Sequence, residues 1–250
     1  MTSRRFYRQL MENERMVSFT VKVKETDLWI AVDALHFSEN LSSLVEKHIW
    51  GKRQELEKFI NYCPEFQTTI EPFIVENPHE LPDIALQMMR AGNKVNVGPM
   101  AAVAGIFAEL AGEYLLEDAR EVIVENGGDI FLQVENTCRV GVYAGNSPLS
   151  GKVALEIMPE STPLGICTSS ATVGPSYSSG EADAVVVLSP STPLADAVAT
   201  SVGNMIDGQK NLEEILQTAL QIEGIEGLLI IQGEKMAAQG NIKLVKAESS

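Results

Sequence analysis

Alternating apolar and polar positions near the N-terminus predict a β-hairpin. Every second residue from Val17 to Val23 is apolar, which is the period of a strand with one buried face. The polar stretch KETD then leads into a second apolar run, LWIAVD. Turn-forming residues between two such runs are typical of a hairpin, so two antiparallel strands are expected here.

The pattern changes to a helical period after this hairpin. Apolar residues between Leu41 and Cys63 fall on one helical face, and Pro64 ends the helix. A shorter helix is expected from Asp83 to Ala91. The segment GPMAAVAGIFAELAG, residues 98–112, is apolar or small on every side except at Glu109. A helix with this composition is enclosed by protein, so we expect it at the centre of the fold.

Short alternating segments follow and predict an antiparallel sheet. The expected strands are EVIVEN, DIFLQVE, RVGVYAG, KVALEIM, ADAVVVL, GLLIIQG and NIKLV, with helices near residues 194–206 and 212–220. Antiparallel strands with segregated helices indicate an α+β fold. We expect one domain over residues 1–250, built from an N-terminal part (1–92), a central helix and sheet (93–190) and a C-terminal part (191–250).

The helix that follows Thr192 and Pro193, a predicted N-cap and first helical residue, lacks long polar side chains. No Lys, Arg, Glu or Gln occurs between Leu194 and Ile206. Its polar face is either exposed to solvent or packed closely against another surface. On that face Asp196 and Thr200 lie one turn apart, and their oxygens are of the type that Mg²⁺ prefers.

Three further segments are candidates for ligand binding. The glycines of VENGGDIF predict a tight hairpin, and the same turn would let a ligand approach its backbone, with Asp129 at its edge. A helix that starts at Gly98 and Pro99 has unpaired N–H groups, which suit a phosphate. Residues 165–183 are rich in hydroxyl groups and are expected to form a long binding loop.

Composition excludes several classes of protein. The formal net charge of −15 argues against binding to nucleic acid or to an anionic membrane. The three cysteines are odd in number and lack C-x-x-C spacing, so neither a disulfide framework nor a zinc site is expected. No uninterrupted apolar run reaches the roughly 18 residues of a membrane span. The N-terminus has no apolar core of a signal peptide, so we expect a cytoplasmic protein.

Taken in chain order, VGPMAAVAGI, VENGGDI, ICTSSATVGPSYSSGEADA and LADAVATSVGN resemble a prokaryotic family related to the ApbE flavin transferases. ApbE proteins carry a Gly-Gly-Asp turn, a Thr-Ser-Gly segment and an Ala-Asp-Ala-x-x-Thr helix in this order. The resemblance implies a T-fold-like α+β architecture and a homodimer. It also implies the use of FAD and Mg²⁺ to attach FMN to a Ser or Thr of a partner protein.

Site residues follow from combining the resemblance with the patterns above. The resemblance makes Asp196 and Thr200 the metal ligands. The residues expected to bind the flavin nucleotide, FAD or FMN, or another phosphorylated ligand are Gly98, Pro99, Asn126, Gly127, Gly128, Asp129, Thr168, Ser169 and Ser170.

The chain also departs from the ApbE pattern. Val97 stands where ApbE proteins have a lysine, and Ala102 stands where they have an aspartate. Their His-x-x-Asp-Pro-x-Thr-Gly segment is missing, and Pro175 occupies a position where the closer family has a histidine. These departures favour a protein that keeps the pocket with lost or altered chemistry. Retained FMN transfer and a non-catalytic accessory role in anaerobic sulfur assimilation or homocysteine formation remain open as alternatives.

Overall fold

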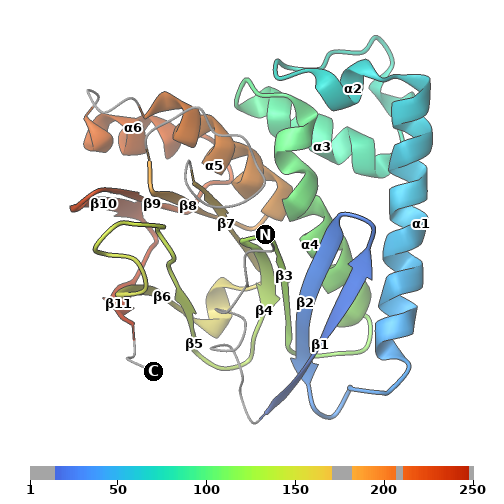
Figure 1. The fold of residues 1–250 in the computed structure, drawn as a ribbon, viewed down its shortest axis with the longest axis horizontal. Helices are drawn as coiled ribbons and strands as arrows, with labels where there is room; N and C mark the ends of the chain where they lie inside the picture. The colour runs from blue at the N-terminus through green and yellow to red at the C-terminus, as the bar shows by residue number, and fades with distance from the viewer. Residues whose placement is uncertain (1–14, 171–181, 207–210, 248–250) are drawn as a thin grey trace.

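The computed structural model describes residues 15–170, 182–206 and 211–247. Its centre is an antiparallel sheet with helices on one face and a smaller sheet against the other (Figure 1). The large sheet has the strand order β1-β2-β3-β4-β7-β8-β9-β10, and every pairing in it is antiparallel. The predicted α+β class is therefore confirmed.

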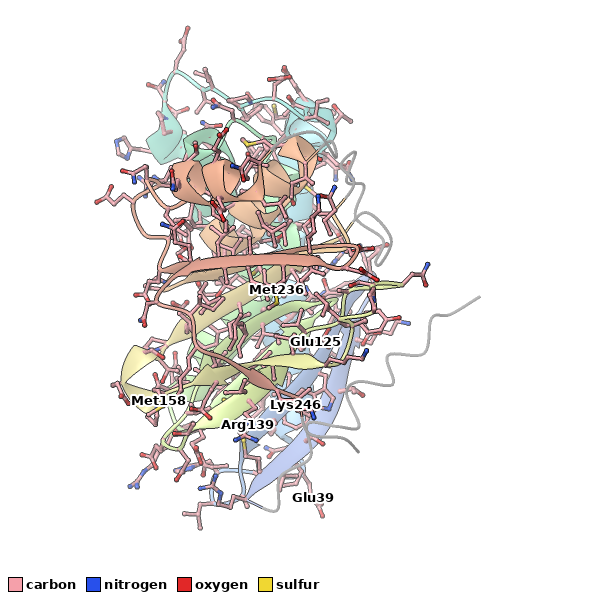
Figure 2. The ribbon with its side chains drawn as sticks, turned by 90° about the vertical axis from the view of Figure 1, so that its left-hand side faces the viewer. Glu39, Glu125, Arg139, Met158, Met236 and Lys246 are labelled. Carbon is pink, nitrogen blue, oxygen red and sulfur yellow. The ribbon has the colours of Figure 1, made fainter. Side chains whose placement is uncertain are left out.

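The strands come from all three described ranges of the chain. In the large sheet they are β1 (Met16–Val23), β2 (Thr26–Asp33), β3 (Val122–Asn126), β4 (Asp129–Gln133), β7 (Leu164–Ser169), β8 (Ala184–Ser189), β9 (Gly227–Gln232) and β10 (Lys235–Gly240). The small sheet has the order β11-β6-β5, with β11 (Leu244–Lys246), β6 (Val153–Ile157) and β5 (Cys138–Gly141). Figure 2 shows Arg139 of β5 and Lys246 of β11 on this small sheet.

The helices all lie on the opposite side of the large sheet from the small one. They are α1 (Leu41–Tyr62), α2 (Glu65–Thr68), α3 (Asp83–Lys94), α4 (Val103–Leu116), α5 (Thr192–Met205) and α6 (Leu212–Ala219). Short 3₁₀ turns are η2 (Pro78–Glu80), η3 (Pro99–Ala102), which leads directly into α4, and η4 (Pro159–Ser161).

Two apolar cores explain the long apolar strands. In β8, Val185 and Val187 pack into the core beneath the helices, while Val186 and Leu188 pack into the core beneath the small sheet. A strand covered on both faces has no polar side to present. Edge strand β1 alternates instead, because Val21 and Val23 are buried while Thr20 and Lys22 are exposed.

Helix α4 occupies the centre of the helical layer, as its composition predicts. A Cβ at Gly112 would lie 2.0 Å from the ring of Phe131, so the helix and strand β4 are in direct contact. Among the described residues, one helix, Pro99–Leu116, is long and apolar enough to cross a membrane by length and composition, with a mean hydropathy of 1.3. More than half of it, 56%, is buried inside the protein, which accounts for its apolar character.

Several predicted elements were wrong in detail. The long loop expected over residues 165–183 begins with strand β7 up to Ser169, because its small and hydroxyl residues hide the buried positions Ile166 and Cys167. Strand β10 was missed because KMAAQG is exposed and has no β-branched residue. The strand expected from RVGVYAG ends at Gly141. Residues 171–181, with Pro175, lie outside the described part of the chain.

Candidate functional site

Helix α5 packs against strands β7 and β8 of the large sheet and against the neighbouring helix α4, which explains its lack of long polar side chains. A Cβ at Gly105 of α4 would lie 2.6 Å from the carbonyl oxygen of Thr192, so the two helix backbones touch. Ala195 and Ala199 are fully covered. The small-residue face therefore packs inside the protein, and the reading of a solvent-exposed face is wrong for these residues.

The start of α5 is held by a buried carboxylate. Glu109 of α4 accepts a hydrogen bond from the backbone N–H of Thr192 through Oε2 over 2.6 Å. Thr192 is the first helical residue and Ser191 the cap, which corrects the predicted N-cap at Thr192; neither side chain caps the helix. Burial raises the pKa of Glu109, while the hydrogen bond from Thr192 opposes this. The carboxylate thus stabilises the end of α5 that carries Asp196.

One turn further along α5, Asp196 contacts the same helix. Its Oδ2 accepts a hydrogen bond from the backbone N–H of Gly105 over 2.9 Å. Burial and the charge of Asp129 raise the pKa of Asp196 well above its usual range, while the Gly105 N–H acts in the opposite direction. The two predicted site residues Asp196 and Asp129 are therefore close enough to repel each other.

The glycine turn between β3 and β4 is anchored to the first turn of α4. Asn126 donates from Nδ2 to the carbonyl oxygen of Ala104 over 3.0 Å. Gly127 and Gly128 adopt φ values of +70° and +116°, which favour glycine, and the Gly128 N–H donates to Oε1 of Glu125 over 2.8 Å. The turn therefore closes the β3–β4 hairpin. It also lies next to Gly105, whose N–H donates to Asp196.

Strand β7 is tied to this turn through Asp129. Its Oδ1 accepts a hydrogen bond from the backbone N–H of Thr168 over 3.3 Å. Burial raises the pKa of Asp129 to about 7, and the charge of Glu125 adds to this, while hydrogen bonds from Cys167 and Thr168 oppose it. The adjacent Cys167 thiol is fully buried, and burial together with the Asp129 charge raises its pKa well above the usual value.

These contacts bring together segments that are far apart in the sequence. We call this set of residues the motif junction: Ala104, Gly105, Asn126, Gly127, Gly128, Asp129, Thr168 and Asp196. Sequence reasoning missed Ala104, Gly105 and Glu109 as supporting residues, although Glu109 was visible as the one charged position of the segment 98–112.

The remaining predicted residues lie on α5, at the start of η3 and at the end of β7, and they make other contacts. Thr200 is half-buried on α5, one turn beyond Asp196. Gly98 and Pro99 are buried at the start of η3, where the Gly98 N–H already donates to the carbonyl oxygen of Ile70 over 2.8 Å. Ser169 and Ser170 are buried at the end of β7.

The donor set of the junction suits a hydrated magnesium ion better than a metal held by protein side chains alone. Among the described residues, no group of three or more His, Cys, Asp or Glu side chains is placed to hold a metal. Mg²⁺ usually takes one or two carboxylates and completes its shell with water and phosphate oxygens. Two mutually repelling carboxylates, Asp129 and Asp196, with the hydroxyl of Thr200 one turn away, match this chemistry.

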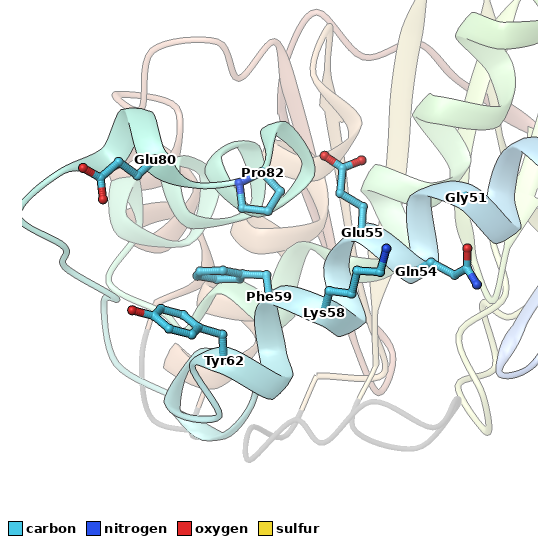
Figure 3. A pocket seen from close by; sticks show the side chains of 8 residues that line it. All are labelled: Gly51, Gln54, Glu55, Lys58, Phe59, Tyr62, Glu80 and Pro82. Carbon is cyan, nitrogen blue, oxygen red and sulfur yellow. The ribbon is translucent and has the colours of Figure 1, made fainter.

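Surface grooves in the described part of the chain also lie away from the motif junction. Two grooves of about 430 Å³ each follow helix α1, and Figure 3 shows the one that includes Phe59, Tyr62 and Pro82. Neither is lined by a residue of the motif junction. We place the candidate site at the junction because its polar groups converge there.

Comparisons with known proteins identify the family and the fold. The family described as AbpE bacteria matches residues 8–223. A UPF0280 protein of Methanocella arvoryzae is 42% identical over 228 residues, which cover 90% of each chain. Another, from Methanococcus maripaludis strain C6, is 42% identical over 234 residues, covering 91% of this chain and 92% of the relative.

Solved structures share the fold at low sequence identity. The ApbE protein of Thermotoga maritima superposes with a TM-score of 0.55 at 13% identity, covering 89% of this chain and 96% of the other. The flavinyl transferase ApbE of Pseudomonas stutzeri gives a TM-score of 0.54 at 12% identity, with coverages of 92% and 95%.

Proposed function

This chain belongs to the family described as AbpE bacteria, and we propose that it binds a flavin nucleotide together with Mg²⁺ at the motif junction. The solved structures with the same fold include proteins titled as flavin transferases, which makes FAD or FMN the first ligand to test. The observation that carries the proposal is the Asp196–Gly105 hydrogen bond beside the Asn126–Ala104 hydrogen bond. Through these two contacts, the predicted metal ligand and the glycine turn share one support.

The glycine turn offers a backbone that a nucleotide can approach. Among the described residues, a Cβ at Gly127 would meet nothing within 4 Å, and one at Gly128 would meet only the carbonyl oxygen of Thr168 at 3.8 Å. Glycine at both positions leaves this space to a ligand and also permits the positive φ values. We assign the flavin nucleotide to this open side of the turn, beside Thr168.

In this proposal Asp196 and Thr200 hold the metal, and Asp129 is the second acid next to it. When bound, Mg²⁺ supplies positive charge that neutralises phosphate oxygens. The chain needs this help because its net charge of −15 otherwise repels a phosphorylated ligand. Asp129 and Asp196 hold protons readily because both pKa values are raised, so metal binding is expected to release protons at neutral pH.

We propose binding rather than flavin transfer because two ApbE-like polar positions belong to the apolar core of this chain. Val97 is 8% exposed and Ala102 is completely buried, and both pack in the core beneath the helices. Neither side chain can donate a proton or bind a phosphate. Covalent attachment of flavin to a partner protein in the presence of FAD and Mg²⁺ would contradict this part of the proposal.

The test is a titration of the full chain with FAD and with FMN, monitored by flavin fluorescence, with MgCl₂ or with EDTA. The expected result is saturable binding with Mg²⁺ that weakens at least about tenfold with EDTA, or with Mg²⁺ in Asp196→Asn. Asp118→Asn removes an exposed carboxylate away from the junction and is the matched control, expected to bind like the wild type. Equal affinity with and without Mg²⁺ would refute the metal role.

A further inference from the structure

Nothing in the described part of the structure requires a glycine at position 51. Gly51 lies near the middle of α1 on the exposed side, and a Cβ there would meet nothing within 4 Å. An exposed glycine inside a helix costs about 1 kcal/mol relative to alanine. The usual reasons for glycine, a positive φ or a close intramolecular neighbour, are both missing at this residue. Glycine at this position leaves room for the close approach of another molecule.

Gly51 also lies where two grooves meet. Both grooves along α1 are lined by Gly51 and Glu55, so the two adjoin at these residues. In one direction the combined surface contains His48, which stacks on Tyr114 of α4 with ring centroids 4.4 Å apart. In the other direction it reaches Tyr62, whose surface is 88% exposed (Figure 3). We call this surface the α1 groove.

Charges along the α1 groove are unpaired, unlike those on the other flank of the helix. Lys47 lies one turn before Gly51 and Glu55 one turn after it, and neither side chain has an ion-pair partner among the described residues. On the flank that faces the β1–β2 hairpin, by contrast, Arg53 pairs with Glu25 and with Glu57. Among the charges of the groove, Lys47 and Glu55 therefore form a pair of opposite, unpaired charges that lie four residues before and four residues after Gly51.

We propose that the α1 groove is the interface between two copies of this chain, with the α1 helices crossing antiparallel at Gly51. A two-fold axis at this residue places Lys47 of each copy opposite Glu55 of the other, which forms two equivalent ion pairs. Residues seven before and seven after Gly51 also meet, so the exposed Leu44 packs on the aliphatic part of Lys58. Glycine at the crossing lets the two backbones approach closely.

This arrangement is self-complementary, which favours a second copy over an unrelated partner. Two copies of a chain with a net charge of −15 repel each other over most of their surfaces. The α1 groove carries Lys47, Lys52 and Lys58 with Glu55 and Glu80, so its charges are nearly balanced, unlike those of the chain as a whole. The inference is independent of the flavin proposal.

A cysteine at the crossing point tests the geometry directly. A two-fold axis at Gly51 brings the two residues at this position within the 4.4–6.8 Å Cα separation that a disulfide needs, as a general range. Gly51→Cys should form a disulfide-linked dimer under mild oxidation, above the background of the wild type with its native cysteines. Asn61→Cys, exposed on the same helix, is the control and should remain at background. Equal cross-linking of both variants would overturn the proposed crossing.

Charge exchange tests the pairing. By light scattering after size exclusion, the full chain should have twice the mass of the 27.2 kDa protomer. Lys47→Glu or Glu55→Lys alone should weaken the dimer at least about tenfold, and the two changes together should restore it. Glu46→Lys alters an exposed charge outside the groove and should leave the dimer unchanged. A wild-type monomer at all concentrations, or no rescue by the double change, would overturn the proposal.

Discussion

The backbone N–H of Gly105 donates a hydrogen bond to Oδ2 of Asp196 over 2.9 Å, across 91 residues of sequence. This contact joins α4 to α5 at the point where their backbones touch. Because the carbonyl of Ala104 binds Asn126 next to it, the same turn of α4 also supports the glycine turn. The position of the predicted metal ligand therefore depends on the packing of two helices.

Gly105→Ala tests the helix contact. The added Cβ would lie 2.6 Å from the Thr192 carbonyl oxygen and 2.9 Å from the Asp196 Cβ, so α5 must shift. We expect a loss of about 1–3 kcal/mol in the free energy of unfolding, measured by urea denaturation. Gly51→Ala is also inside a helix but has open space around it. At protein concentrations low enough to keep the chain monomeric, it should instead stabilise the chain by about 0.5–1 kcal/mol. Equal effects at both positions would contradict the close crossing.

Glu109 offers a test of how the start of α5 is held. Glu109→Ala removes the acceptor for the Thr192 N–H inside the protein and should cost about 1–3 kcal/mol of unfolding free energy. Glu109→Gln keeps an acceptor oxygen and avoids burying a charge, so its cost should be smaller. Glu113→Ala, one turn along α4 and exposed, is the control with little expected change. If Glu109→Gln and Glu109→Ala have the same free energy of unfolding, the hydrogen bond between Thr192 and Glu109 does not hold the start of α5.

Asp129 should make stability depend on pH between about 4 and 7. Its folded pKa of about 7 lies above the usual 3.8, so the folded state binds the extra proton within this window. The stability that comes from protonated Asp129 is fully present below the pKa of the unfolded state. It is lost as the pH rises through 7. Asp129→Asn stays neutral and should therefore gain stability over the wild type at pH 8, by up to roughly 4 kcal/mol.

The comparison is made by denaturation in magnesium-free buffer at several pH values, with Asp118→Asn as the control. The difference in unfolding free energy between Asp129→Asn and the wild type should be near zero at pH 4 and should increase up to pH 8. A constant difference over this range would mean that Asp129 is charged in the folded protein at all these pH values. The control should show no such trend, because Asp118 is exposed.

Much of the fold was predictable because periodicity reports burial. The hairpin β1–β2, the helix α1 and the enclosed α4 follow from apolar patterns that local sequence displays. Strand β7 was not predictable in this way, because its buried residues include Gly165 and Cys167 and its partners β4 and β8 come from distant segments. The burial of both faces of β7 is a property of the assembled sheet.

The site was predictable only as a set of motifs. The glycine turn and the pair Asp196 and Thr200 were recognisable from spacing, but the meaning of the small residues on α5 required the contact with Gly105. The assignments of ligand, metal and dimer remain predictions. The proposed link to sulfur metabolism also remains a prediction, because no described residue bears on it.

Native mass spectrometry of the freshly purified full chain tests the central claim most directly. The account predicts a non-covalent complex whose added mass equals FAD or FMN with Mg²⁺, formed during purification or after incubation with both. The complex should be largely lost in Asp196→Asn and retained in Asp118→Asn. Only the mass of the bare chain after incubation of the wild type, or equal retention by Asp196→Asn, would contradict a metal-dependent flavin site at the motif junction.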